Sequence, residues 1–265
     1  MYAFDYQRPA SRADAVAAAS GAETRYLAGG QSLIQAMKLR LSQSECLVDL
    51  GAIADLKGIA AEGGGVTIGA MVTHAAIADS AEVRRTVPAL AELAGGVGDP
   101  MVRNMGTLGG SVANADPAAC YPAAVLGLGA TVHTNKRTIA GEAFFTGLFE
   151  TALDPGELIV AVSFPAVQKA AYVKYKQPAS RFALVGVFVC QAAGGVRVAV
   201  TGARGSVFRA TEVEQALVKN FTPEAALGVE VSADGINGDM HGSAAYRAAM
   251  ISMMASRAVA AVLAR

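Results

Sequence analysis

The spacing of apolar residues divides the chain into a first part of alternating short strands and helices and a strand-rich last part. Up to residue 165, compact apolar runs are separated by stretches with apolar residues three and four positions apart, as at Leu33, Ile34, Met37 and Leu41. Such spacings predict strands joined by helices. The predicted helices cover residues 11–19, 31–41, 73–78, 82–94 and 118–128, and the predicted strands cover 25–28, 46–50, 66–68, 130–134 and 157–164.

After Pro165 the pattern changes. Residues 172–176, 185–190 and 196–201 are rich in β-branched or aromatic residues and are bounded by turn residues, which predicts three strands. Helices are predicted over residues 211–218 and 244–263. The last helix carries a methionine-rich face, which we interpret as core or subunit interface because methionine fills irregular gaps. The last hundred residues therefore read as a separate α+β domain.

A paired glycine stands where the first of these strands should turn into a helix. Residues 26–34 read Tyr-Leu-Ala-Gly-Gly-Gln-Ser-Leu-Ile. Two adjacent glycines allow a tight turn and close approach to the backbone. Free N–H groups at such a turn, followed by a helix start, favour an anion such as a phosphate or diphosphate. An ordinary strand-to-helix turn is the alternative for this stretch alone.

A second paired glycine lies in residues 103–111, which read Arg-Asn-Met-Gly-Thr-Leu-Gly-Gly-Ser. Hydroxyl residues flank the pair on both sides. We expect two glycine loops that together clamp one diphosphate. Neither stretch is the G-x-G-x-x-G dinucleotide fingerprint, and neither is a P-loop.

Composition narrows the class of protein. The chain has 265 residues, 53% of them hydrophobic, and 22 basic residues balance 22 acidic ones. This length supports one large domain or two smaller ones. A neutral balance without a basic cluster argues against nucleic-acid binding. No run approaches the ~18 apolar residues of a membrane helix, and no secretory signal is visible. We therefore expect no integral membrane segment and a cytoplasmic location.

Cysteine and histidine give no metal pattern. Cys46, Cys120 and Cys190 are odd in number and widely spaced, which fits a reducing cytoplasm and supplies neither a disulfide framework nor an iron–sulfur site. The three histidines are far apart and are interpreted as ordinary surface or helix residues. A G-x-S-x-G nucleophile motif is also absent from the sequence.

Several motifs in a fixed order resemble one known family. Beyond the two glycine stretches, they are Val-Asp-Leu at 48–50, Ile-Gly-Ala at 68–70, Thr-His at 73–74, Ala-Asp-Pro at 115–117, Gly-Glu-Leu-Ile at 156–159 and Tyr-Lys at 175–176. In order and spacing the chain resembles the FAD-binding medium subunits of the molybdenum hydroxylases, the family of carbon monoxide dehydrogenase and xanthine dehydrogenase. The resemblance covers essentially the whole chain.

The resemblance implies a fold of the α+β class. Residues 1–165 would form a two-part FAD-binding domain of the vanillyl-alcohol-oxidase (PCMH) type, with parts of about 1–55 and 56–165. Residues 166–265 would form the family's C-terminal flavoprotein domain, a three-stranded antiparallel sheet with helices.

The resemblance also implies a cofactor site for FAD. One segment would wrap the diphosphate, a second would hold it from the other side, and four further residues would line the flavin ring; Phe182 is equally interpretable as a core phenylalanine. The implied residues are Ala28, Gly29, Gly30, Gln31, Ser32, Leu33, Ile34 and Gln35, then Thr107, Leu108, Gly109, Gly110 and Ser111, then Val97, Ile159, Lys176 and Phe182. No catalytic base and no metal ligand are assigned to this chain.

Two positions depart from the family pattern. Ser111 stands where relatives usually have asparagine, and a serine still donates a hydrogen bond. Cys120 stands where relatives usually have an aspartate that contacts the cofactor, and a thiol is a poor acceptor. Either that contact is lost or Asp116, four residues earlier, partly replaces it. The departure bears on cofactor affinity and not on cofactor identity.

By the same resemblance this chain would carry electrons. Substrate would be oxidised at molybdopterin on a large subunit, and electrons would pass through [2Fe–2S] clusters on a small subunit to FAD here and on to an external acceptor. A dimer of heterotrimers is the family habit. Three alternatives stay open: a stand-alone FAD-dependent oxidase, a flavin-free assembly subunit, and an unrelated phosphate-binding module. The sequence selects neither the substrate nor the acceptor, which could be NAD, a quinone, oxygen or a carrier.

Overall fold

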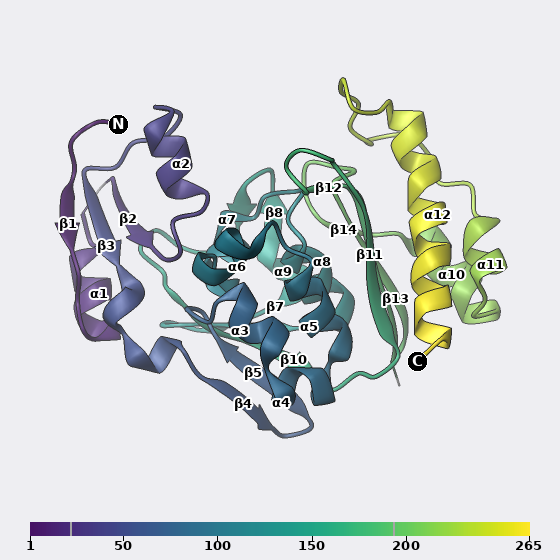
Figure 1. The fold of residues 1–265 in the computed structure, drawn as a ribbon, viewed down its shortest axis with the longest axis horizontal. Coiled ribbons are helices and arrows are strands. Elements are labelled where there is room, and N and C mark those ends of the chain that lie inside the picture. The colour runs from purple at the N-terminus through teal and green to yellow at the C-terminus, as the bar shows by residue number, and fades with distance from the viewer. Residues whose placement is uncertain (22, 193) are drawn as a thin grey trace.

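The computed structural model describes residues 1–21, 23–192 and 194–265. Within those residues, a three-stranded, a five-stranded and a four-stranded sheet follow one another along the chain, with helices between and around them (Figure 1). The prediction of an α+β protein is confirmed. The arrangement leaves the N-terminal sheet at one end of the molecule and the C-terminal sheet and helices at the other.

The N-terminal part is a small parallel sheet with two helices. Its strands lie in the order β1-β3-β2, and both pairings are parallel, as the predicted strand–helix–strand unit requires. The predicted helix over 31–41 is shorter in the structure, because Arg40 has a φ of +58° and lies outside the helical region. The elements are β1 (Asp5–Gln7), α1 (Arg12–Ala18), β2 (Thr24–Leu27), α2 (Leu33–Lys38) and β3 (Cys46–Asp49), followed by two 3-10 turns over residues 50–52 and 54–56.

The middle part is an antiparallel sheet covered by helices. Its strands lie in the order β4-β5-β10-β6-β7. Its helices and the sheet enclose the largest buried apolar cluster. The elements are β4 (Ile59–Glu62), β5 (Gly65–Gly69), α3 (His74–Asp79), α4 (Ala81–Thr86), α5 (Pro88–Gly95), α6 (Pro100–Met105), α7 (Leu108–Asn114), α8 (Tyr121–Leu128), β6 (Thr131–Thr134), β7 (Thr138–Ala140), α9 (Gly141–Phe144), β8 (Phe145–Gly147), β9 (Glu150–Thr151) and β10 (Ile159–Pro165).

Two sequence predictions in this part are wrong. The single helix predicted over 82–94 is two helices, α4 and α5, because Pro88 has no N–H and disfavours the helical conformation at Val87. The second glycine stretch, predicted as a loop, is the joint between α6 and α7. Its paired glycines, Gly109 and Gly110, lie inside the first turn of α7.

The C-terminal part is an antiparallel sheet of four strands in the order β11-β12-β13-β14. The three predicted strands are present, but the prediction of a three-stranded sheet is wrong. A two-residue strand, β14, pairs with the end of β13 at Ala199 and Val200. The elements are β11 (Ala170–Lys176), β12 (Ala183–Ala192), β13 (Gly195–Thr201), β14 (Phe208–Arg209), α10 (Thr211–Lys219), α11 (Pro223–Leu227) and α12 (Ala244–Leu263).

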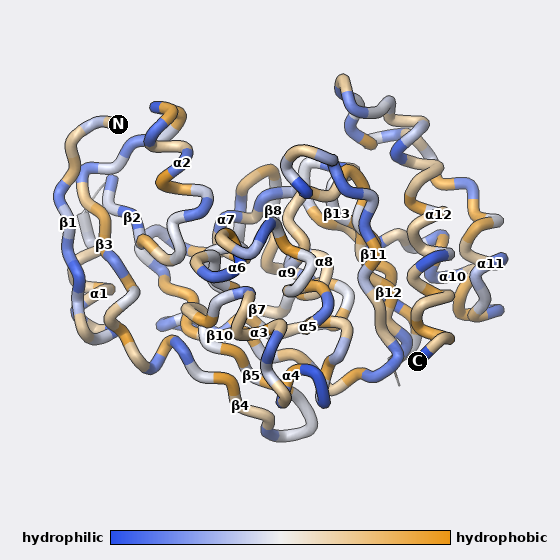
Figure 2. Tube along the Cα trace, in the orientation of Figure 1, coloured by the Kyte–Doolittle hydropathy of each residue, from blue (hydrophilic) through white to orange (hydrophobic). Residues whose placement is uncertain are grey.

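This sheet is buried on both faces, because helices pack against each of them. The strands β12 and β13 run largely through hydrophobic, orange segments (Figure 2). Along β12, Val185, Val187 and Val189 belong to the apolar cluster on the α12 side, while Phe188 and Cys190 belong to the cluster that contains α8. This alternation follows the two-residue period of a strand. The middle part and the C-terminal sheet therefore share one core. Met254 of α12 is fully buried, so the methionine-rich face is core in that turn.

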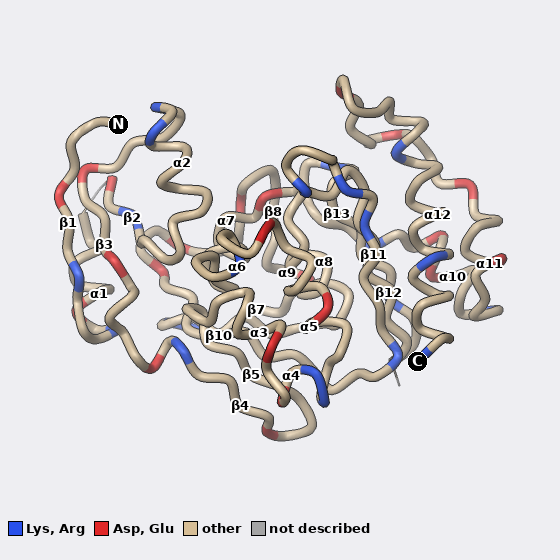
Figure 3. The backbone as a smooth tube through the Cα atoms, in the orientation of Figure 1, with Lys and Arg blue, Asp and Glu red and all other residues tan. Residues whose placement is uncertain are grey.

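Charged residues of both signs are distributed over the whole chain (Figure 3), in keeping with its formal net charge of zero. One ion-pair group ties α9 to the C-terminal sheet, since Glu142 lies 3.0 Å from both Arg197 Nη1 and Arg209 Nη1. In the described part of the chain, none of the helices is at once long enough and apolar enough to span a bilayer.

The close packing of α8 on the C-terminal sheet predicts the effect of a substitution at Gly127. A Cβ at this position would come within 2.8 Å of the ring of Phe188, which is fully buried and has no room to move. We expect Gly127→Ala to lower the free energy of unfolding by about 1–2 kcal/mol, because overpacking outweighs the gain in helix propensity. Denaturant unfolding measures this quantity.

The matched control is Gly95→Ala in α5. Its Cβ would make an ordinary contact of 3.7 Å with Ala78. We expect a change within about 0.5 kcal/mol at this helix end. Equal effects of the two substitutions would contradict the packing argument.

Candidate functional site

A cavity of about 520 Å³ lies where the N-terminal sheet, the helices of the middle part and the hairpin of β11 and β12 meet. Its lining includes residues from four regions of the sequence, at 24–33, 70–120, 153–159 and 174–182. Pockets for organic cofactors have volumes of this size, roughly 300–1,000 Å³.

The first glycine segment (residues 28–33) forms one wall of this cavity. It connects β2 to α2, and Gly30 adopts a φ of +70°, a conformation that glycine reaches without strain. Within the described chain, the N–H groups of Gly29, Gly30, Gln31 and Ser32 have no hydrogen-bond acceptor. Four successive N–H groups without partners beside a cavity suit an anion.

The second glycine segment (residues 105–111) contributes differently. Thr107 caps α7 by accepting a hydrogen bond from the N–H of Gly110 at 3.2 Å. The N–H groups of Leu108 and Gly109 donate to the carbonyls of Val72 and Ala70, at 3.0 and 2.8 Å. The first-turn N–H groups of α7 are thus already used by the protein. This segment presents a small glycine surface and the hydroxyl of Ser111.

The two glycine segments touch. A Cβ on Gly29 would overlap the carbonyl oxygen of Met105 and come within 2.8 Å of the Cα of Gly106. A Cβ on Gly110 would lie 3.4 Å from that of Ala28. Stretches that lie about 80 residues apart in the sequence therefore meet at one side of the cavity, and only glycine at position 29 permits this approach.

Most of the residues implied for the cofactor site border the cavity. Those that do are Ala28, Gly29, Gly30, Gln31, Ser32, Leu33, Val97, Thr107, Gly109, Gly110, Ser111, Asp116, Cys120, Ile159 and Phe182. Those that the structure places outside its lining are Ile34, Gln35, Leu108 and Lys176. Phe182 is 46% exposed, so the interpretation of this residue as a core phenylalanine is wrong.

Lys176 is exposed, whereas Lys174, two residues earlier on β11, borders the cavity. Residues two apart on a regular strand share a face, but the pairing of β11 with β12 shifts register between Tyr175 and Lys176. Lys174 Nζ donates to the carbonyl of Arg181 at 2.9 Å and lies 3.2 Å from Cys120 Sγ. From the two-residue period of a strand, Lys174 could have been suggested together with Lys176. The register shift that separates the two side chains cannot be read from the sequence.

Asp116 and Cys120 stand on the same wall, before α8. The carboxylate of Asp116 accepts the N–H of Ala118 at 2.8 Å. Burial raises the pKa of Asp116, and this hydrogen bond opposes the rise. The cavity wall thus carries a carboxylate at position 116 and a thiol at position 120, where the resemblance implies an aspartate at position 120.

His74 is a lining residue that the sequence analysis did not assign to the site. It is buried at the start of α3, 5.2 Å from the ring of Tyr121, and its Nδ1 has no partner among the described residues. Burial and the nearby charge of Arg103 lower its pKa to about 4. The imidazole is therefore neutral at physiological pH. The Thr-His motif at residues 73–74 could have pointed to His74 as a lining residue. The interpretation of His74 as an ordinary surface or helix histidine left it out of the site.

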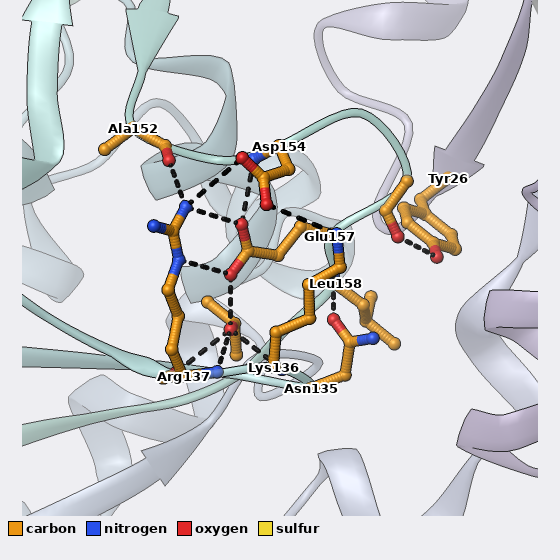
Figure 4. Close-up of polar contacts among 10 residues, drawn as sticks. Tyr26, Asn135, Lys136, Arg137, Ala152, Asp154, Glu157 and Leu158 are labelled. Atoms are coloured by element: carbon orange, nitrogen blue, oxygen red, sulfur yellow. Dashed lines mark hydrogen bonds and ion pairs between the residues drawn. The ribbon is translucent and has the colours of Figure 1, made fainter.

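The turn that carries residues 153–159 to the cavity is held by a buried carboxylate. Glu157 accepts hydrogen bonds from Arg137 (3.0 and 3.1 Å), from the hydroxyl of Thr134 (2.6 Å) and from the N–H of Asp154 (2.8 Å) (Figure 4). The Arg137 ion pair and these hydrogen bonds lower the pKa of Glu157 to about 2. Tyr26 donates to the carbonyl of Gly156 at 2.9 Å, which fastens the N-terminal sheet to the same turn.

These residues fit an extended anionic cofactor such as FAD. Unpartnered N–H groups at the first glycine segment suit a diphosphate, and Gly29 and Gly30 carry no side chain there. Farther along, the cavity is lined by Val97, Leu158 and Ile159 and by the aromatic ring of Phe182, which suit a flat apolar ring system. Fold and cavity together define a dinucleotide-binding protein of the α+β class.

Comparisons with known proteins give the family. The sequence profile described as "FAD binding domain in molybdopterin dehydrogenase" matches residues 2–167. The carbon monoxide dehydrogenase medium chain of Afipia carboxidovorans is 42% identical over 68% of this chain and 66% of that one. The nicotine 6-hydroxylase medium subunit of Paenarthrobacter nicotinovorans is 33% identical over 97% and 96%. The solved structure of reconstituted carbon monoxide dehydrogenase from Oligotropha carboxidovorans aligns with a TM-score of 0.92 at 35% identity, over 100% of this chain and 99% of that one.

The chain therefore belongs to the family of FAD-binding medium subunits of the molybdenum hydroxylases. It contains an FAD-binding domain and is a component of an oxidoreductase. The resemblance found in the order of the sequence motifs is confirmed.

The hydrogen bonds of Glu157 predict a pH-dependent stability. A carboxyl whose pKa falls from 4.5 to about 2 on folding stabilises the folded state above pH 4.5, and this contribution disappears as the pH falls toward 2. We expect Glu157→Gln to lower the free energy of unfolding by roughly 2–3 kcal/mol at pH 7. Denaturant unfolding at pH 7, 4 and 3 should show the variant and the unmodified protein converging as the pH falls.

Glu62→Gln on the exposed strand β4 is the control, with an expected change within about 0.5 kcal/mol. The free energies of unfolding of Glu157→Gln and the unmodified protein could instead differ by a constant amount from pH 7 to pH 3. That result would show that the Glu157 charge is not the source of the stabilisation.

Proposed function

We propose that this chain is the FAD-carrying electron-transfer subunit of a molybdenum hydroxylase. FAD accepts electrons from [2Fe–2S] clusters on a small partner subunit and passes them to an external acceptor. The substrate is oxidised at molybdopterin on a large partner subunit. The observation that carries this proposal is the row of unpartnered N–H groups at the first glycine segment, beside a cavity of about 520 Å³, in a chain of this family.

Each segment of the cavity has a separate task in this proposal. The first glycine segment donates N–H groups to the diphosphate, and the residues from Thr107 to Ser111 close its other side with a hydroxyl and glycine surface. Val97, Ile159 and Phe182 bracket the flavin ring. Residues 1–165 bind the cofactor as a two-part domain of the vanillyl-alcohol-oxidase type, with parts of about 1–55 and 56–165, and residues 166–265 form the C-terminal flavoprotein domain.

The relatives support a division of labour between subunits. One relative is a medium chain of carbon monoxide dehydrogenase, and another is a medium subunit of nicotine 6-hydroxylase. The two names refer to two different substrates. Chains so similar to this one serve different reactions, which fits a medium subunit that transfers electrons while a partner selects the substrate. A dimer of heterotrimers in the cytoplasm is the assembly that we propose.

The first test is the absorption spectrum of the protein purified with the chains that accompany it. We expect FAD and iron–sulfur absorption, together with one larger and one smaller chain. Extraction and chromatography identify the flavin. A purified complex that contains no flavin, and that takes up none when FAD is added, would refute the proposal.

The second test removes the anion site. Gly30→Val forces a branched residue into a φ of +70° and brings its Cβ within 3.0 Å of Ile34, next to the unpartnered N–H groups. We expect a loss of bound FAD of at least tenfold in the purified complex, measured as the flavin-to-protein ratio. Gly110→Val should act similarly, because its Cβ would stand 2.9 Å from Thr107 Oγ1 and 3.4 Å from Ala28 at the same cavity wall.

Gly58→Val is the control, since a Cβ there meets no atom within 4 Å. Full flavin content in both Gly30→Val and Gly110→Val would mean that the diphosphate lies elsewhere.

A further inference from the structure

Lys174 brings a positive charge to the cavity wall without a carboxylate to balance it. Its side chain is half-buried on β11, and Nζ is held by two acceptors that are not carboxylates, the carbonyl of Arg181 and the sulfur of Cys120. Across the described residues, no carboxylate oxygen lies within 4.0 Å of this nitrogen. A half-buried charge without a counterion is costly, and a ligand with negative charge offsets that cost.

The other charged groups around this wall do not neutralise it. The carboxylate of Asp116 is turned to the N–H of Ala118, 2.8 Å away. Arg181 also borders the cavity and donates from Nη1 to the carbonyl of Gly98 at 3.3 Å. Arg103 donates to the carbonyls of Val97 and Gly98. Lys174 and Arg181 both border the cavity, and Lys174 contacts the cavity-lining thiol of Cys120.

We propose that Lys174, rather than Lys176, is the cation that the cavity presents to the bound flavin, and that a cysteine at position 120 leaves its charge available. This inference rests on the proposed function. Two electrons from an iron–sulfur donor and one proton from solvent convert an oxidised flavin into a reduced flavin with one additional negative charge. An ammonium at the cavity wall stabilises that charge and shifts the equilibrium toward the reduced flavin. A carboxylate at position 120 would pair with Lys174 and cancel this effect.

The test measures the two-electron midpoint potential of the flavin in the purified complex by redox titration, together with flavin content. We expect Lys174→Met to shift the equilibrium between oxidised and reduced flavin tenfold or more toward the oxidised form, about 30 mV for a two-electron couple. Lys176→Met removes the same charge two residues further along the strand, where the side chain is exposed. We expect a shift of less than threefold for that variant.

A second pair of variants tests the role of position 120 without altering the lysine. Cys120→Asp places a carboxylate beside Lys174 Nζ and is expected to shift the equilibrium in the same direction as Lys174→Met. Cys120→Asn has nearly the same shape without the charge and is expected to leave the potential within threefold. This pair carries the test even if Lys174→Met loses its flavin.

The outcomes separate this inference from the proposed function. Suppose the unmodified complex binds flavin, but Lys176→Met shifts the midpoint potential more than Lys174→Met does. This result would overturn the assignment of Lys174 and leave the proposed function intact. Equal potentials for Cys120→Asp and Cys120→Asn would likewise overturn the role of the cysteine. A complex without flavin would refute both proposals together.

Discussion

The backbone contact between Gly29 and the Met105–Gly106 joint is the constraint on which the cavity depends. It is formed where a Cβ cannot fit, so the N-terminal sheet and the helices of the middle part approach to main-chain distance. The N–H groups of the first glycine segment, which borders the cavity, have no acceptor among the described residues. The hydrogen bond from Tyr26 to Gly156 fixes the same two parts from the other side. The cavity of about 520 Å³ borders both of these connections.

Two paired glycines in one sequence look equivalent, but their hydrogen bonds make them different. At the first segment the N–H groups have no acceptor in the described chain, whereas at α7 the carbonyls of Ala70 and Val72 already use them. An anion placed at α7 would compete with hydrogen bonds that hold the helix to the middle part. Among the described residues, the first segment therefore offers N–H groups without acceptors, whereas the second offers a close approach to its backbone. Glycine spacing alone cannot distinguish these roles.

Sequence periodicity predicted those elements whose pattern is set by burial. The strands of the C-terminal sheet alternate between two apolar clusters, and α12 begins and ends where predicted, after a serine cap. Periodicity failed where a local backbone feature interrupts a regular element. Pro88 divides one predicted helix, and another ends before Arg40. The register shift after Tyr175 separates Lys176 from the face of Lys174. The short strands β1, β4, β7, β8, β9 and β14 were missed, because segments of two to four residues carry too little pattern. Most of the residues that line the cavity in the implied set could be named from motifs, but only the register of the sheet shows that Lys174 and not Lys176 borders it.

The shared core of the middle part and the C-terminal sheet has a consequence for the flavin end of the cavity. Residues of β12 contribute to the cluster around α8, and the ion pairs of Glu142 join α9 to β13 and β14. The hairpin that carries Lys174, Arg181 and Phe182 is therefore anchored to the same body as Asp116 and Cys120. A charge held at a fixed place costs no reorganisation when the flavin changes its charge, which is the condition under which an electrostatic contribution is largest. In the proposed FAD complex, burial of both faces of the C-terminal sheet would therefore hold Lys174 at a fixed place beside the flavin.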